Sequence, residues 1–296
     1  MKKLILNLIL VSLVSLVVSC LFYSCVKYAN SNDKYVDSIQ IKGSDTIVNL
    51  IQTWSENFVK QHRIYNVSVT GGGSGTGFAS LINKTCDIAM SSREIEYKEA
   101  LLANGNNVKP VEFKVGLDGL VVLVNKNNPV DKLTIKQLRD IFMAKITNWK
   151  EVGGKDLKIV ILSRENNSGT HMFFKERVLR NNNKNAKDEF SIHSLMMSSS
   201  QAVYDEVMQN PNALGYVGMG FVNDGVKVLS VAIDNKGSYI YPSTENVLKG
   251  LYPISRPLYL YTNGEPSGVV KMFIDYALSD DGQKVVLDTD FVPIKK

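Results

Sequence analysis

A short segment near the middle of the chain, "SRENNSGTHMFF" (residues 163–174), combines an arginine with the beginning of a helix. Arg164 stands four residues ahead of Ser168-Gly169-Thr170, which opens an apolar helical run. The first backbone N–H groups of a helix have no partner inside it, and the helix dipole adds partial positive charge there. Hydroxyls and a guanidinium at such a place are typical of an oxyanion site.

Three other turns have the same chemistry. The segments "KGSDTIV" (42–48), "GGGSGTGF" (71–78) and "AMSSREI" (89–95) each join a predicted strand to a predicted helix and carry hydroxyls. Taken singly, each is a weak signal, because a serine or threonine at a helix start is usually only a cap. The glycine-rich segment also lacks the lysine of a Walker loop and the spacing of the dinucleotide fingerprint. Four such turns together predict a cage for a tetrahedral oxyanion.

The elements that must position these turns alternate along the chain. Strands are expected at 67–70 and 87–90, and a helix at about 94–103. Thr134 and Gln137 have the spacing of a capping box. Because strands alternate with helices, the sequence predicts an α/β fold with mostly parallel sheets flanked by helices.

Two long β-rich stretches interrupt this alternation, at about 113–124 and 252–262. Each is long enough to cross from one lobe to another, so we expect two lobes joined by two hinge crossings. Lobe 1 would contain residues 38–116 plus 259–296, and lobe 2 residues 117–258. A ligand between such lobes lies at helix starts beyond the strand ends.

The N-terminus has the pattern of a secretory signal peptide, predicted over residues 1–19. Two lysines precede an apolar run that is short for a membrane span and ends at a small residue followed by Cys20. The cysteine after that small residue resembles a bacterial lipobox, so we predict lipid at Cys20, with Cys25 as the alternative. An uncleaved N-terminal anchor is the other interpretation. Residues 20–37 read as a flexible tether. Every interpretation places the folded part outside the cytoplasm.

The composition argues against nucleic-acid-binding and metal-binding proteins. The hydrophobic share of 44% and the charged share of 21% are those of a soluble globular protein, and the net charge of +5 comes without a basic run, so no nucleic-acid partner is expected. Cys86 precedes an apolar strand and is predicted to be a buried small hydrophobe. The histidines are His62, His171 and His193, too far apart for ligand spacing, so we expect no metal.

The order of the motifs closely resembles the phosphate-binding subunit of the bacterial phosphate ABC transporter, the PstS-like proteins. The matching segments are 43–46, 71–78, 87–94, 118–130, 141–149 and 163–170. The resemblance extends from about Ile39 to the C-terminus. It implies a class II periplasmic-binding-protein fold whose lobes close over orthophosphate and deliver it to the transporter's permease subunits. It also implies a monomer without cofactor or catalysis.

By position, the resemblance also implies which residues bind the anion. Thr46 and the backbone N–H of Ile47 would bind from the first helix and Ser74 from the glycine-rich turn, and lobe 2 would supply Arg164, Ser168, Gly169 and Thr170. The same turns add Ser44, Gly75 and Thr76 as candidate ligands.

One position departs from the family pattern. Ser92 falls where the best-studied branch has an aspartate that accepts the proton of bound phosphate. A carboxylate that accepts this proton would repel sulfate, so we hypothesise that Asp45 replaces the missing group, although Asp45 as a simple helix cap is an equal alternative. Glu165 and Asp87 are weaker candidates. Arg93 either touches the anion or pairs with a nearby acid to hold its loop.

Functions of other classes remain to be weighed. The same cage would accept sulfate or molybdate. A serine phosphatase or hydrolase is less favoured, because no nucleophile is paired with a base at recognisable spacing and the glycine-rich segment is not a G-x-S-x-G elbow.

Overall fold

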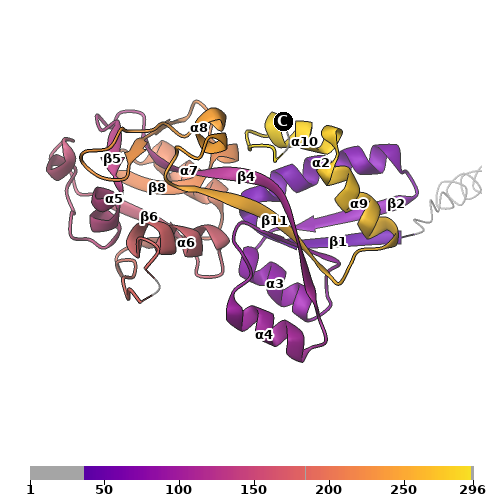
Figure 1. The fold of residues 1–296 in the computed structure, drawn as a ribbon. Helices are drawn as coiled ribbons and strands as arrows, with labels where there is room; N and C mark the ends of the chain where they lie inside the picture. The colour runs from indigo at the N-terminus through magenta and orange to yellow at the C-terminus, as the bar shows by residue number, and fades with distance from the viewer. Residues whose placement is uncertain (1–36, 184, 295–296) are drawn as a thin grey trace, which may run out of the picture.

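The computed structural model describes residues 37–183 and 185–294, and Figure 1 shows them as two α/β lobes joined by two long strands. The predicted signal peptide and both candidate lipidation cysteines lie outside the described residues.

The first lobe is built from both ends of the described chain (Figure 1). Its elements are β1 (Asp37–Gly43), the 3-10 turn η1 (Asp45–Ile47), α2 (Val48–Gln61), β2 (Tyr65–Thr70), α3 (Ser74–Ile82), β3 (Ile88–Ser91), α4 (Tyr97–Gly105), α9 (Gly268–Leu278) and α10 (Asp280–Asp288). Strand β1 lies between β2 and β3 and runs parallel to both. The carboxyl ends of these three strands therefore meet at one edge of the sheet.

The second lobe is built from the middle of the chain. Its elements are β5 (Lys132–Thr134), α5 (Ile135–Phe142), η2 (Trp149–Val152), β6 (Val160–Arg164), α6 (Gly169–Phe174), the π-helical turn η3 (Lys175–Leu179), β7 (Leu195–Met197), α7 (Ser200–Gln209), β8 (Ala213–Gly218), η4 (Met219–Phe221), β9 (Val226–Val228), β10 (Ser230–Ala232) and α8 (Thr244–Leu248). Strand β6 runs parallel to both of its neighbours, β7 and β8.

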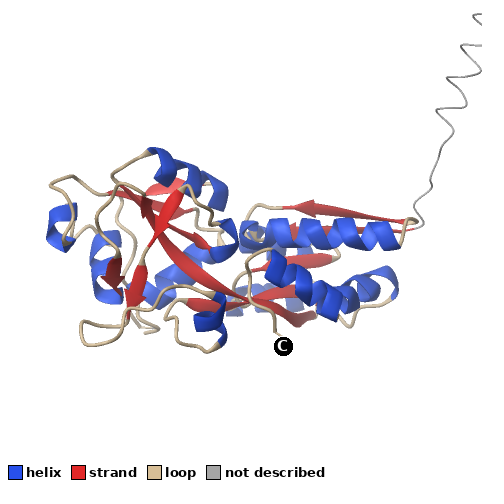
Figure 2. Cartoon of the chain, turned by 90° about the horizontal axis from the view of Figure 1, so that it is seen from above, coloured by secondary structure: helices blue, strands red, loops and turns tan. Residues whose placement is uncertain are grey.

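Strands β4 (Pro110–Asn125) and β11 (Ser255–Asn263) join the lobes as an antiparallel pair, which we call the hinge ladder. Strand β11 pairs with β3 in lobe 1, and the second half of β4 pairs with β8 in lobe 2. The strand order β2-β1-β3-β11-β4-β8-β6-β7 is thus unbroken, and Figure 2 shows the strands passing from lobe to lobe. The register shifts between Leu258 and Tyr259, next to one of the lobe boundaries that we propose.

The predicted elements are found with small shifts. The strands expected at 67–70 and 87–90 are β2 and β3, and the capping box of Thr134 and Gln137 is present at the start of α5. The helix expected from residue 94 begins later, at Tyr97. The reason is a second capping box, in which Glu96 and Glu99 fix the first turn of α4.

Both lobes have apolar cores that follow the sequence pattern. The apolar face of α2 is buried, and the indole N–H of its Trp54 donates to the carbonyl of Gly282, 2.8 Å away. This hydrogen bond ties the N-terminal half of lobe 1 to the C-terminal helix α10. The lobe therefore depends on segments from the two ends of the chain.

Candidate functional site

The four predicted anion-binding turns all lie at carboxyl ends of parallel strands. Three of them follow β1, β2 and β3 in lobe 1, and the fourth follows β6 in lobe 2. Six of the buried hydroxyls in these turns form what we call the hydroxyl cluster: Ser44, Thr46, Ser74, Ser92, Ser168 and Thr170.

Contacts between hydroxyls of different turns link most members of the cluster. The hydroxyl oxygens of Thr46 and Thr170, one from each lobe, are 2.7 Å apart. Ser44 donates to the hydroxyl of Ser92 at 3.0 Å, and the backbone N–H of Ser92 donates to Ser74 at 3.1 Å. Residues that lie far apart in sequence therefore meet between the lobes.

Two of these serines are also helix caps. Ser44 accepts from the backbone N–H of Thr46 at 3.2 Å, and Ser168 accepts from the N–H groups of Thr170 and His171 at 3.2 and 3.3 Å. A cap uses an oxygen lone pair and leaves the hydroxyl hydrogen free to be donated. The capping and ligand roles are therefore compatible at these positions.

The lobes touch directly at Gly169. A Cβ atom on this glycine would lie 2.2 Å from the hydroxyl oxygen of Ser74 and 2.7 Å from that of Ser92, so both hydroxyls would have to move to make room for it. Beside this contact, the backbone N–H of Gly75 donates to the carbonyl of Asn167 at 3.0 Å. The structure is therefore a closed arrangement of the two lobes.

Arg164 connects the lobes through Asp45. Its Nη2 atom donates to the Asp45 carboxylate at 2.7 Å and to the carbonyl of Ser198 at 3.0 Å. Its Nη1 donates to the Ser200 hydroxyl at 3.0 Å, and its Nε to the carbonyl of Met197 at 3.1 Å. A guanidinium has five N–H groups, so in this arrangement Arg164 keeps one N–H group for an anion.

Asp45 has a donor on each carboxylate oxygen. One oxygen accepts from Arg164 and the other from the backbone N–H of Gly72, 2.9 Å away. The cap of the first turn is Ser44. Of the weaker carboxylate candidates, Glu165 is exposed, and Asp87 stands before β3, at the opposite end of this strand from the cluster.

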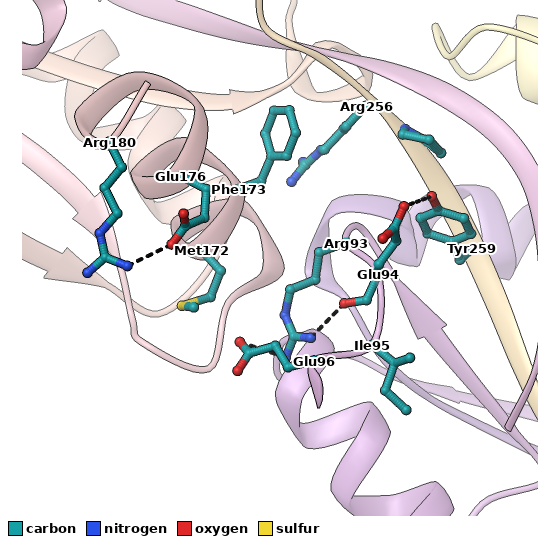
Figure 3. A pocket seen from close by; sticks show the side chains of 11 residues that line it. Arg93, Glu94, Ile95, Glu96, Met172, Phe173, Glu176, Arg180, Arg256 and Tyr259 are labelled. Carbon is teal, nitrogen blue, oxygen red and sulfur yellow. Dashed lines mark hydrogen bonds and ion pairs between the residues drawn. The ribbon is translucent and has the colours of Figure 1, made fainter. Parts of the chain in front are cut away.

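Arg93 pairs with an acid. Its two terminal nitrogens donate to the two carboxylate oxygens of Glu99, both at 2.7 Å, and its guanidinium lies over the ring of Phe78. Figure 3 shows Arg93 on the wall of a cavity of about 620 Å³ that separates the loop before α4 from α6 and η3. These contacts match the loop-holding role among the two that we considered.

Thr76 also bonds within its own turn, since its hydroxyl donates to the carbonyl of Gly72 at 2.6 Å. Ile47 is fully buried at the end of η1.

A second arginine–aspartate pair, which the sequence analysis did not name, lies beside the cluster. Nε and Nη2 of Arg256 donate to one oxygen of Asp118 at 2.9 and 2.8 Å, and the other oxygen accepts from the N–H of Met219 at 3.0 Å. Nη2 also reaches the hydroxyls of Thr46 and Thr170, at 3.3 and 3.0 Å. The pair stands on the hinge ladder, where the two residues face each other across β11 and β4.

Burial shapes the electrostatics of this pair. Asp118 is 0% exposed and Arg256 2% exposed. Burial raises the pKa of Asp118, although the positive charge of Arg256 beside it acts in the opposite direction. Burial lowers the pKa of Arg256, and the negative charge of Asp118 opposes that shift. An arginine remains protonated under such conditions. The sequence signal was that Asp118 is the single acid of the 113–124 stretch and Arg256 the single charged residue of the 252–262 stretch.

A buried polar network lies behind the lobe 2 turn. The Ser163 hydroxyl is 3.2 Å from Nδ1 of His171 and 2.7 Å from the hydroxyl of Tyr216. Burial lowers the pKa of His171 to about 4, so the imidazole is neutral at pH 7. Because Ser163 precedes Arg164 and His171 follows Thr170, this network fixes both ends of the anion-binding turn.

Comparison with known proteins agrees with this geometry. The family model described as the PBP superfamily domain matches residues 29–281. The "Phosphate-binding protein PstS" of Bacillus subtilis (strain 168) is 30% identical over 99% of this chain and 94% of its own length. That of Staphylococcus aureus (strain USA300) is 32% identical over 81% of this chain and 74% of its own length.

This chain belongs to the PstS family of the PBP superfamily.

Solved structures show the same fold. A putative phosphate ABC transporter substrate-binding protein from Clostridium perfringens, determined with bound phosphate, is 31% identical with a TM-score of 0.78, covering 87% of this chain and all of that one. An ABC-type phosphate transport receptor from Vibrio cholerae is 30% identical with a TM-score of 0.68, and the match covers 86% of this chain and 99% of that one. The predicted PstS-like, two-lobed α/β fold is thus confirmed.

Among the described residues of this PstS-like chain, no group of three or more metal-ligating side chains is close enough to hold an ion. Cys86 is a free, buried thiol, and burial raises its pKa to about 12.

Proposed function

We propose that this protein binds inorganic phosphate between its lobes and carries it to an ABC transporter. The observation that carries the proposal is the convergence of hydroxyls from four turns and two lobes beside two arginines. Each arginine is already neutralised by an aspartate. The anion would therefore be held by N–H and O–H dipoles rather than by excess charge, as expected for a small, fully dehydrated oxyanion.

The names of the relatives support the choice of ligand. The Bacillus and Staphylococcus proteins are called phosphate-binding proteins, and the Clostridium structure holds phosphate. Sulfate and molybdate have the same tetrahedral shape and remain the competing ligands. No feature of the cluster favours catalysis, since the serine–histidine contact of Ser163 and His171 is buried in lobe 2.

A thermal unfolding series tests the ligand directly. A ligand that binds only the folded state at one hundred times its Kd adds about 2.7 kcal/mol of stability. We expect phosphate to raise the unfolding midpoint at a lower concentration than sulfate or molybdate does. A larger effect of sulfate or molybdate would reassign the site to that anion. Turnover of a phosphomonoester by the purified protein would contradict a purely binding function.

We further propose Asp45 as the carboxylate that accepts the proton of bound phosphate. It stands on η1 among the cluster turns, and its two donors leave lone pairs on both oxygens. Sulfate has no such proton and would face the carboxylate with oxygen lone pairs, an unmatched contact that costs about 1–3 kcal/mol.

Asp45→Asn should narrow the difference between phosphate and sulfate affinity, as measured by isothermal titration calorimetry. Glu165→Gln is the matched control, because Glu165 is an exposed acid of the lobe 2 turn. If Asp45→Asn discriminates between the two anions as the unaltered chain does, Asp45 has no such role.

We also propose that the chain is a lipid-anchored, extracytoplasmic monomer. The support is the cysteine that follows the signal-like N-terminal sequence. Within the described part of the chain, none of the helices has the length and apolar character to cross a membrane. In cells that express the full chain, Cys20→Ser should move the protein from the membrane to the soluble fraction, whereas Cys25→Ser should not. The reverse result would assign the lipid to Cys25, and retention of both variants would indicate an uncleaved anchor.

Delivery to a permease has its own test. Cells that depend on the cognate transporter should lose phosphate uptake at low external phosphate when this chain is deleted. Unchanged uptake would contradict the transport role while leaving phosphate binding intact.

A further inference from the structure

The two arginines at the hydroxyl cluster differ in how many N–H groups are free. Arg164 uses four of its five N–H groups on protein acceptors. Arg256 uses its Nε and one Nη2 hydrogen on Asp118, and its other Nη2 hydrogen lies between two threonine hydroxyls. Its Nη1 atom is buried and has no hydrogen-bond partner among the described residues.

Such an unpartnered group requires an explanation. Arg256 is 2% exposed, and a buried charged N–H without an acceptor is costly. Figure 3 shows its guanidinium turned into the gap between the lobes, with the ring of Phe173 beside it at 5.5 Å. An aromatic face stabilises the cation but accepts no conventional hydrogen bond. The unused donors of Arg256 therefore face the space where the two lobes meet.

The position of Arg256 is also special with respect to the lobes. Its Nη2 atom contacts Thr46 of lobe 1 and Thr170 of lobe 2, whereas the residue itself belongs to the hinge ladder. An anion that accepts from both threonine hydroxyls would lie within reach of this guanidinium. Arginine is suited to such a place because its planar fork matches two oxygens of one anion.

We propose that Arg256 is a third source of anion ligands, supplied by the hinge ladder, and that Asp118 sets its strength as an internal counter-ion. The inference rests on the proposed anion-binding function and adds the hinge to the two lobes as a part of the binding site. In the absence of the anion the positive charge of Arg256 is balanced by Asp118, and on binding the free Nη1 donors gain an acceptor.

The proposal predicts opposite effects for the two partners. Removing the guanidinium should weaken phosphate binding by about ten- to a hundredfold, the loss expected for hydrogen bonds to a charged group. Asp118→Asn keeps the shape but leaves Arg256 without a counter-ion, so phosphate should bind more tightly than to the unaltered chain. A pair with a purely structural role would weaken binding in both variants.

The decisive variant is the double substitution Arg256→Gln with Asp118→Asn. It removes both charges together, so neither is left buried alone, and such neutral replacements commonly preserve folding. Phosphate affinity is measured by calorimetry, and folding by circular dichroism and the unfolding midpoint without phosphate. We expect a folded protein with about ten- to a hundredfold weaker phosphate binding. A folded double variant with unaltered affinity would overturn the proposal.

Arg180→Gln is the matched control. Arg180 lines the same cavity as Arg256, but its guanidinium is paired with Glu176 and Glu189. This variant should leave phosphate affinity unchanged, and an equal loss would show that any arginine near the cavity acts through long-range charge, which contradicts a specific ligand role.

The unaltered chain separates failure of this inference from failure of the proposed function. If the unaltered chain binds no phosphate, both the function and the inference fail. If it binds phosphate and the folded double variant binds equally well, only the role of Arg256 is lost. If Asp118→Asn fails to fold, the double variant still gives the answer.

Discussion

Two arginine–aspartate pairs flank the hydroxyl cluster, and they differ in what holds them together. Arg164 and Asp45 come from different lobes, and Asp45 is 15% exposed. Arg256 and Asp118 face each other across the hinge ladder and are 2% and 0% exposed. The first pair exists only while the lobes are closed, whereas the backbone keeps the second together when they part. An arginine–aspartate pair thus forms on lobe closure in the first case, and it stabilises the hinge ladder in the second.

The largest effect should come from breaking the hinge pair. Asp118→Ala leaves the buried charge of Arg256 without a partner, which costs about 3–5 kcal/mol of unfolding free energy. Urea denaturation without phosphate measures this loss. A loss below that of the corresponding Asp45 variant would show that the two pairs have been ranked in the wrong order.

Acidification should lower the stability of lobe 2, because it protonates the buried His171. The unfolded chain protonates His171 near pH 6.5, but the folded chain does so only near pH 4. The unfolded state therefore binds more protons in this window, and stability should fall by up to about 3 kcal/mol as the pH decreases from 6.5 to 4. His171→Asn, compared with the unaltered chain by denaturation at each pH, should flatten this part of the curve. Parallel curves would contradict the buried neutral imidazole.

The Gly169→Ala substitution should have a smaller effect, and that effect should fall on lobe closure rather than on folding. Gly169→Ala places a methyl group against the hydroxyls of Ser74 and Ser92, and overpacking of this kind costs about 1–3 kcal/mol. The clash exists only between closed lobes, so it should appear as about ten- to a hundredfold weaker phosphate binding with the unfolding midpoint unchanged in the absence of phosphate. Gly153→Ala is a control at a glycine with open space around it, although its positive φ of 87° makes a small loss of stability expected there. Unaltered phosphate binding by Gly169→Ala would mean that the lobes close less tightly around the ligand.

The smallest effect should come from the lobe-bridging pair. Asp45→Ala breaks a pair that joins the two lobes. When the lobes part in the absence of phosphate, both partners face solvent, and exposed pairs contribute about 0–1 kcal/mol. Denaturation without phosphate should therefore show little change, in contrast to Asp118→Ala. A loss as large as that of the hinge variant would indicate that the lobes remain closed without ligand.

Local patterns explain what the sequence could predict. Each anion-binding turn consists of a few hydroxyl residues between a strand and the beginning of a helix. Its position at the end of the strand can therefore be predicted from the residues on either side of it. The hinge strands were also visible as long β-rich stretches. The pairing of Arg256 with Asp118 was not visible, because it depends on the antiparallel register of strands that lie far apart in sequence.

The partners of Arg164 were hidden for a related reason. Three of them, Met197, Ser198 and Ser200, come from the end of β7 and the beginning of α7, which no local signal connects to the turn after β6. The sequence could therefore place the guanidinium near the cage but could not count its remaining donors. Such a count requires coordinates, and it is what distinguishes the two arginines.

The placement of β11 has a consequence for biosynthesis. One neighbour of β3 in the lobe 1 sheet is β11, and α9 and α10 cover that lobe only after nearly the whole chain has been made. Until then, β3 presents an open edge that can pair with other chains. A nascent polypeptide of this kind cannot complete its first lobe until almost all of its residues have been synthesised.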